Sequence, residues 1–164
     1  MELDPADMAE GTEQALLEMD HAIWRIACSY SQSREEAEDI AQSARLRIWE
    51  ARGQFCGRSN VRTWMYRIAL NVASDHRRFR LRHAQSVLNE EFAAPEQDWS
   101  PLFDLRRALS RLSVRQRQVV TLRELEHLSY KEIAEALGLS VGTVESTLFD
   151  ARRKLRRLLS VKED

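Results

Sequence analysis

Cysteine, glycine and proline are scarce in this chain of 164 residues, which contains two Cys, five Gly and three Pro. Two cysteines cannot build a disulfide framework, and Cys28 and Cys56 lack the spacing of metal ligands. With few breakers and 43% apolar residues, the composition favours an all-α fold over a strand-rich one. The chain also lacks a carboxylate cluster or a His/Cys metal spacing. We therefore predict no catalytic residue, no metal site and no cofactor, and a protein that is not an enzyme.

Long apolar runs are missing as well. No stretch is long enough to span a bilayer. The first residues are acidic and contain no apolar segment of the kind found in signal peptides. These two observations predict a cytoplasmic protein without stable membrane insertion.

The formal net charge is only −1, but the charges are strongly segregated along the chain. Residues 1–20 carry seven acids and no Lys or Arg, whereas residues 76–83 carry four Arg and two His and no acid. Residues 83–100 are acidic again, and residues 152–157, RRKLRR, are basic. Any single run also fits a solvated helix face. The alternation is better explained by binding to a polyanion such as nucleic acid.

Hydrophobic periodicity divides the chain into two helical domains. In the first, a stripe of Val61, Trp64, Met65, Ile68, Ala69 and Val72 has the spacing of a core-facing helix. An aperiodic acidic stretch with Pro95 follows and is interpreted as a linker. We predict an acidic N-terminal segment (1–15), a first helical domain (16–83), a flexible acidic linker (84–101) and a second helical domain (102–160).

The second domain contains the pattern of a helix-turn-helix. Ser113 with Gln116 and Ser129 with Glu132 have the spacing of capping boxes, so each serine is predicted to begin a helix. Gly138 stands where a helix would end, and Ser140 can cap the helix that follows. This arrangement leaves the start of the last helix exposed, where it can enter a DNA major groove.

Three segments resemble one family. LSVRQRQVVTLRELEHLSYKEIAEALGLSVGTV, REEAEDIAQSARLRIWE and RTWMYRIALNVASDHRR occur in the order and spacing of ECF (group IV, extracytoplasmic-function) sigma factors of the sigma-70 family. The resemblance implies a sigma-2-like bundle and a sigma-4-like helix-turn-helix domain, joined by a linker. It also implies three partners: core RNA polymerase, promoter DNA and an anti-sigma factor that can hold the protein at the inner membrane. The acidic linker would then thread the RNA exit path, where it resembles RNA in charge, although it can equally be a solubilising tether.

The resemblance assigns site residues in the first domain. Core polymerase would bind Glu38, Asp39 and Gln42, which are acids and an amide on a helix otherwise rich in arginine. Trp64 and Tyr66 would stack on unpaired bases, although Trp64 also falls on the apolar stripe and fits a core role better. The residues expected at the −10 element are Phe55, Arg58, Asn60, Arg62, Trp64, Arg67, Asn71, Asp75, Arg77 and Arg78.

The second domain departs from the family pattern. The residues expected at the −35 element are Thr143, Glu145, Ser146, Thr147, Phe149, Asp150 and Arg153. The family usually has basic residues where this chain has Glu145, Thr147 and Asp150, and acids repel phosphates. An acid can also accept a hydrogen bond from a cytosine amino group. We therefore expect unusual or weak −35 recognition, with Arg152, Arg153 and Lys154 attracting the DNA backbone.

Two alternatives remain open from the sequence. An autonomous helix-turn-helix regulator would bind duplex DNA without polymerase, usually as a dimer on spaced half-sites. A sigma mimic would titrate an anti-sigma factor without directing transcription, and the acidic recognition helix favours it. The first helical domain argues against the former, and the basic run at residues 77–82 argues against the latter.

Overall fold

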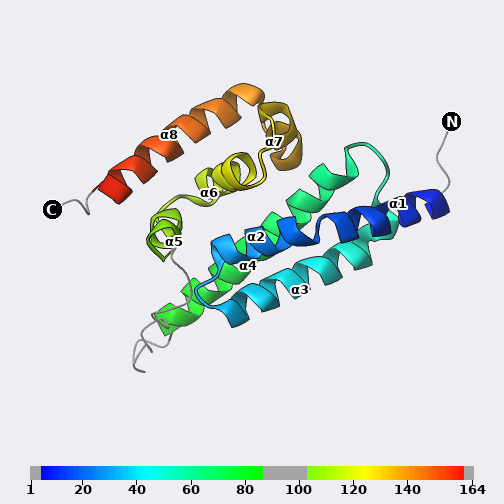
Figure 1. The fold of residues 1–164 in the computed structure, drawn as a ribbon, viewed down its shortest axis with the longest axis horizontal. Helices are drawn as coiled ribbons and strands as arrows, with labels where there is room; N and C mark the ends of the chain where they lie inside the picture. The colour runs from blue at the N-terminus through cyan, green and yellow to red at the C-terminus, as the bar shows by residue number, and fades with distance from the viewer. Residues whose placement is uncertain (1–4, 87–102, 161–164) are drawn as a thin grey trace.

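The computed structural model describes residues 5–86 and 103–160, and the predicted linker lies almost entirely outside them. Every element in these ranges is helical. Lobe 1 contains α1 (Pro5–Glu18), α2 (Asp20–Tyr30), α3 (Arg34–Ala51), the 3-10 turn η1 (Arg52–Gln54) and α4 (Val61–Ser86). Helices α2, α3 and α4 lie side by side as a bundle, with α1 in line with α2 (Figure 1). Helix α4 continues to Ser86, past the predicted start of the linker at residue 84.

Lobe 2 is built from shorter helices. They are α5 (Phe103–Ser110), α6 (Val114–Val120), the π-helical turn η2 (Thr121–Leu125), α7 (Tyr130–Leu137) and α8 (Val141–Ser160). Helix α8 packs against α5, α6 and α7, so the buried Val144, Leu148 and Ala151 form the centre of this lobe (Figure 1). The helix-turn-helix consists of α7, the turn at Gly138 and α8.

The predicted helix ends of lobe 2 are confirmed. The Ser113 and Ser129 hydroxyls each accept a hydrogen bond from the backbone N–H three residues on, and the Gln116 and Glu132 side chains accept one from the backbone N–H of the serine. Gly138 ends α7 in the left-handed conformation, with φ of 65°, which glycine adopts without the strain of a β-carbon. These local bonds define where α7 stops and α8 starts, and hence how the first turn of α8 is presented.

The buried face of α4 differs from the predicted stripe. Met65 and Ala69 are buried as expected, but Trp64, Ile68 and Val72 are only half-buried. The other buried residues of this helix segment include Tyr66, Leu70 and Ala73. The face is rotated because α4 packs against α2 and α3 on one side and against α7 of lobe 2 on another.

The two lobes pack directly on each other. Helix α7 lies against α4, and α5 and η2 lie against α2 (Figure 1). Side chains from both lobes contribute to one hydrophobic core. Within the described ranges, no helix has the length and apolar character required to cross a membrane.

Candidate nucleic-acid interface

The start of α8 presents a polar face to solvent. The Ser140 hydroxyl accepts a hydrogen bond from the Thr143 backbone N–H at 3.1 Å, which caps the helix. Val144 and Leu148 face inward, so Thr143, Glu145, Ser146 and Phe149 are exposed, and Thr147 is half-buried. Phe149 is 67% exposed, which is unusual for a large aromatic side chain in a well-packed helix. The face has the position and exposure that groove contacts require.

The charged side chains of α8 are not equally available. Asp150 Oδ1 lies 3.4 Å from Arg153 Nη2, and Glu145 is exposed. Arg152 pairs with Glu124 of η2 at 2.6 Å, so its predicted role in attracting DNA does not fit this structure. The cations of α8 that lie close together are Arg153, Lys154 and Arg157. They line a groove of about 530 Å³ together with Gln116 and Asp150.

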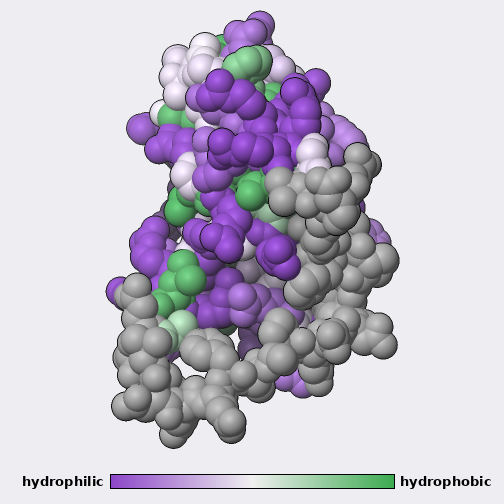
Figure 2. Space-filling model, turned by 90° about the vertical axis from the view of Figure 1, so that its left-hand side faces the viewer, coloured by the Kyte–Doolittle hydropathy of each residue, from purple (hydrophilic) through white to green (hydrophobic). Residues whose placement is uncertain are grey.

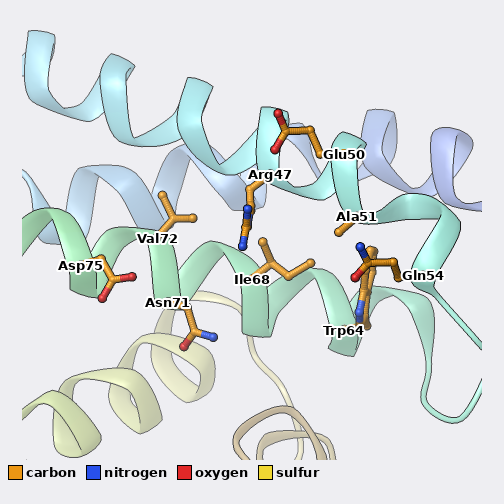
Figure 3. Close-up of a pocket in the computed structure, with 9 residues that line it drawn as sticks. All are labelled: Arg47, Glu50, Ala51, Gln54, Trp64, Ile68, Asn71, Val72 and Asp75. Carbon is orange, nitrogen blue, oxygen red and sulfur yellow. The ribbon is translucent and has the colours of Figure 1, made fainter.

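Lobe 1 carries a second groove, between α3 and α4, of about 450 Å³ (Figure 3). Trp64, Asn71 and Asp75, all predicted at the −10 element, line it. The Arg47 side chain extends from α3 towards α4, and Gln54 lies beside Trp64 (Figure 3). The Phe55 ring lies 5.3 Å from the Trp64 ring, centroid to centroid. Aromatic surface beside amide, carboxylate and guanidinium groups suits a flat polar ligand such as a nucleobase.

Other predicted −10 residues are exposed but outside the groove or already paired. Arg58 is exposed in the loop before α4. Arg78 lies 3.3 Å from Asp75, one turn away on the same helix. Asn60 accepts a hydrogen bond from the Arg62 backbone at the start of α4. Arg62 forms an ion pair with Glu18 of α1.

Three side chains expected at promoter DNA are instead directed into lobe 2. Arg67 donates to the backbone carbonyls of Glu135 and Ala136, at 2.7 and 2.8 Å. Arg77 donates to the Ser110 carbonyl at 2.8 Å. Tyr66 is only 9% exposed and donates to Glu126 at 3.1 Å. In this conformation, Tyr66 is therefore not accessible for the predicted stacking on bases.

The outer face of α3 carries the predicted polymerase contacts. Asp39 and Gln42 are exposed on it. Leu46 and Trp49 follow at helical spacing and are 56% and 44% exposed. Glu38 is also exposed, but it forms an ion pair with Arg34 at 3.0 Å. We call Asp39, Gln42, Leu46 and Trp49 the α3 stripe.

The comparisons with known proteins agree with these two lobes. Residues 18–83 match the family model for sigma-70 region 2, and residues 102–155 match that for sigma-70, region 4. The chain is 34% identical to the ECF RNA polymerase sigma factor SigM of Mycobacterium tuberculosis, over 82% of this chain and 70% of that protein. The chain belongs to the ECF sigma factors.

Two further proteins are similar to this sigma factor. It is 32% identical to the RNA polymerase sigma-H factor of Pseudomonas aeruginosa, over 88% of this chain and 83% of that one. It also resembles the sigma factor RpoE of Bartonella quintana, solved in complex with the anti-sigma factor NepR. That match has a TM-score of 0.71 and 30% identity, and covers 92% of this chain and 98% of the other.

Several side chains of this sigma factor's surface were not predicted. In the α3 stripe, Leu46 and Trp49 were missed, although large apolar residues on the outer face of an amphipathic helix are a readable signal. In the groove, the additional residues come from α3, η1 and the half-buried face of α4: Arg47, Glu50, Ala51, Gln54, Ile68 and Val72. Only the packing of α3 against α4 brings them together, so no local pattern identifies them.

The two basic runs of the sigma factor lie at the same end of the molecule. The C-terminal ends of α4 and α8 are both at the left of Figure 1. Figure 2 looks onto that end, and its described part is mostly hydrophilic with small apolar spots. One exposed aromatic in this region is Phe79, whose ring lies 4.1 Å from that of His83. Such a surface is compatible with a phosphate backbone.

Proposed function

We propose that this sigma factor binds core RNA polymerase and directs it to promoters. Lobe 1 takes the −10 element and lobe 2 the −35 element. The protein forms and breaks no covalent bond itself and needs no cofactor, because the polymerase performs the chemistry. With polymerase as its partner, it acts in the cytoplasm.

The observation that carries this proposal is the α3 stripe. Exposed Leu46 and Trp49 continue the line of Asp39 and Gln42, so acid, amide and apolar surface share one helix face. Exposed apolar side chains grouped with polar ones are typical of protein interfaces, and tryptophan is enriched among the residues that dominate their affinity. A regulator that only reads an operator has no need for such a stripe in a second lobe.

The DNA contacts follow from the two grooves and the recognition helix. The groove beside Trp64 would take an unpaired base of the −10 element, and stacking would offset the few kcal/mol that flipping costs. The Thr143 and Ser146 hydroxyls would contact base edges of the −35 element, and Phe149 would pack on a thymine methyl group. Arg153 and Arg157 would meet phosphates.

An anti-sigma factor is part of the proposal. The resembling RpoE of Bartonella quintana was solved with the anti-sigma factor NepR, and the match covers both lobes of the present chain. We propose a partner of the same kind here, one that can retain the sigma factor at the inner membrane.

The test is transcription with purified core polymerase. Trp49→Ala should weaken binding to the core enzyme by about 30-fold, the value for a side chain worth about 2 kcal/mol at an interface. Leu46→Ala should reduce it less. The matched control is Leu17→Ala, which removes a leucine 74% exposed on α1, away from the stripe. If Trp49→Ala and Leu46→Ala bind the core enzyme as tightly as Leu17→Ala and the parent chain do, the stripe is not the polymerase surface.

The same assay separates the alternatives. Glu145 and Asp150 on the recognition helix favour a sigma mimic, which would bind an anti-sigma factor and produce no transcript from any template. An autonomous regulator would footprint duplex DNA in the absence of polymerase. A transcript that depends on both the core enzyme and this chain contradicts both alternatives.

A further inference from the structure

Glu126 lies at the centre of the contact between the lobes. It belongs to lobe 2, directly after η2, and its side chain is 1% exposed. Arg25 of α2 donates to it twice, from Nε at 2.9 Å and Nη2 at 2.7 Å. Tyr66 of α4 adds a third hydrogen bond at 3.1 Å. A buried carboxylate with three donors is strongly held, and removal of its partners leaves an uncompensated charge.

The Tyr66 phenol is kept as a donor by its surroundings. Burial and the Glu126 carboxylate raise the pKa of Tyr66 above its ordinary value. The Glu126 hydrogen bond at the same time raises the pKa of Arg25. Both donors therefore keep their protons across the physiological pH range.

The closed arrangement also uses cations that promoter DNA requires. Arg67 donates to Glu135 and Ala136 at the C-terminal end of α7, where the helix dipole favours a cation. Arg77 donates to Ser110 at the end of α5 in the same way. The backbone N–H of Asn60 donates to the Glu135 carboxylate at 3.2 Å. Lobe 2 and a nucleic-acid backbone would therefore compete for the same donors.

Arg117 contributes both contacts and a cost to the closed arrangement. This lobe 2 residue is 2% exposed and donates to the Ser29 carbonyl of lobe 1, with its guanidinium carbon 4.3 Å from the Tyr30 ring centre. Its Nε and Nη1 have no hydrogen-bond partner. Burial, reinforced by Arg77 and Arg80, lowers the pKa of Arg117 to about 10. The Tyr30 ring and the Glu36 carboxylate attract this cation, but its two buried donors without partners carry a desolvation cost in the closed state.

We propose that the packed lobes are a self-inhibited resting state, in which Glu126 holds lobe 2 over the nucleic-acid donors of α4. Arg117 limits the stability of this state, so the lobes can separate when polymerase and promoter DNA bind. Binding to a protein that must first open is weakened by the fraction that is open. The proposal rests on the proposed function for its meaning, but the closing contact can be tested without polymerase.

The experiment compares three variants of the full-length chain. Glu126→Gln removes the buried charge from lobe 2, and Arg25→Gln removes its main partner from lobe 1, where the side chain is 49% exposed. Asp20→Asn is the matched control, because Asp20 pairs with Arg45 of α3 inside lobe 1 and neither residue is among those expected at DNA. The separation of the lobes is measured by small-angle X-ray scattering. The affinity for a fluorescent single-stranded DNA of mixed sequence is measured by anisotropy, since phosphate contacts do not depend on sequence.

Glu126→Gln and Arg25→Gln should both expand the molecule and tighten DNA binding by at least about tenfold, the equivalent of 1.4 kcal/mol. Asp20→Asn should do neither. Circular dichroism checks folding, and Arg25→Gln supplies the answer if Glu126→Gln does not fold. If both variants match the control in size, or expand without binding DNA more tightly, the self-inhibition is refuted. Failure of the proposed function would look different: no variant, nor the parent chain, would bind core polymerase or support transcription.

Discussion

Reversing the charge of two acids on α8 tests the direction in which the recognition helix faces. The changes are Glu145→Arg and Asp150→Arg, made singly and together. Glu145 is exposed, and the Asp150 carboxylate lies 3.4 Å from Arg153 Nη2. The second change therefore removes a repulsive charge and also frees Arg153 for a phosphate.

The size of the effect follows from counterion release. Each phosphate contact contributes about 0.9 to the slope of log affinity against log salt, so the two introduced arginines alone steepen it by about 1.8. A fourfold rise in salt would then reduce the affinity of the double variant at least about 12-fold more than that of the parent chain. At low salt the double variant should bind more tightly, because two repulsions have become attractions.

The assay is fluorescence anisotropy of the polymerase holoenzyme on a labelled −35 duplex across a salt series. Glu35→Arg is the control for each single change, since it alters the charge by the same two units at an exposed position in the first turn of α3. Single variants that match this control, and a double variant whose affinity, salt slope and sequence preference all equal those of the parent chain, would refute the assignment of α8 to DNA. An unchanged slope with a shifted sequence preference would mean that the acids contact bases rather than phosphates.

Three further predictions concern stability. Leu148→Ala should lower the free energy of unfolding, measured by urea denaturation, by about 2–5 kcal/mol, because Leu148 is 1% exposed in the core of lobe 2. The control is Leu159→Ala on the same helix, where the leucine is 41% exposed and the loss should be under about 0.5 kcal/mol. Hydrogen bonds from the Ser129 backbone and hydroxyl lower the pKa of Glu132 below its ordinary value. Its contribution to the stability of lobe 2 is therefore fully present above the ordinary carboxyl pKa and is lost as the pH falls through the lowered one. Glu132→Gln should therefore flatten the acid limb of a stability–pH curve, and an unchanged curve would contradict the capping role. Arg117→Met should stabilise the closed state by about 1 kcal/mol, because the two unpartnered donors of Arg117 destabilise it by more than the single hydrogen bond to Ser29 stabilises it. Small-angle X-ray scattering should then detect greater compaction. An expanded molecule would mean that Arg117 holds the lobes together.

Helix ends were predictable because their chemistry is local. Ser113, Ser129 and Gly138 act on backbone groups within four residues, so their types and spacing contain the information. The helix-turn-helix and its exposed first turn follow from these signals. The sequence also indicated the positions of Trp64, Asn71 and Asp75, which the structure brings to one groove.

Contacts between the lobes were not predictable in the same way. Arg67 and its carbonyl acceptors are 68 and 69 residues apart in the chain, and Arg25 and Glu126 are 101 apart. Hydrophobic periodicity reports how wide an apolar face is, but not which neighbour covers it. For this reason, Tyr66 was interpreted as a base-stacking residue although it faces lobe 2.

The acceptors that hold Arg67 and Arg77 are uncharged backbone carbonyl groups, which affects the electrostatic attraction between the closed molecule and nucleic acid. A carbonyl satisfies the hydrogen-bonding capacity of a guanidinium without cancelling its positive charge. In the closed state, these arginines therefore still attract a polyanion electrostatically, within the screening length of about 8 Å at physiological salt. Under the proposed self-inhibition, the protein can still associate with nucleic acid in the closed state, and the direct hydrogen bonds from Arg67 and Arg77 to the strand form only after the lobes separate.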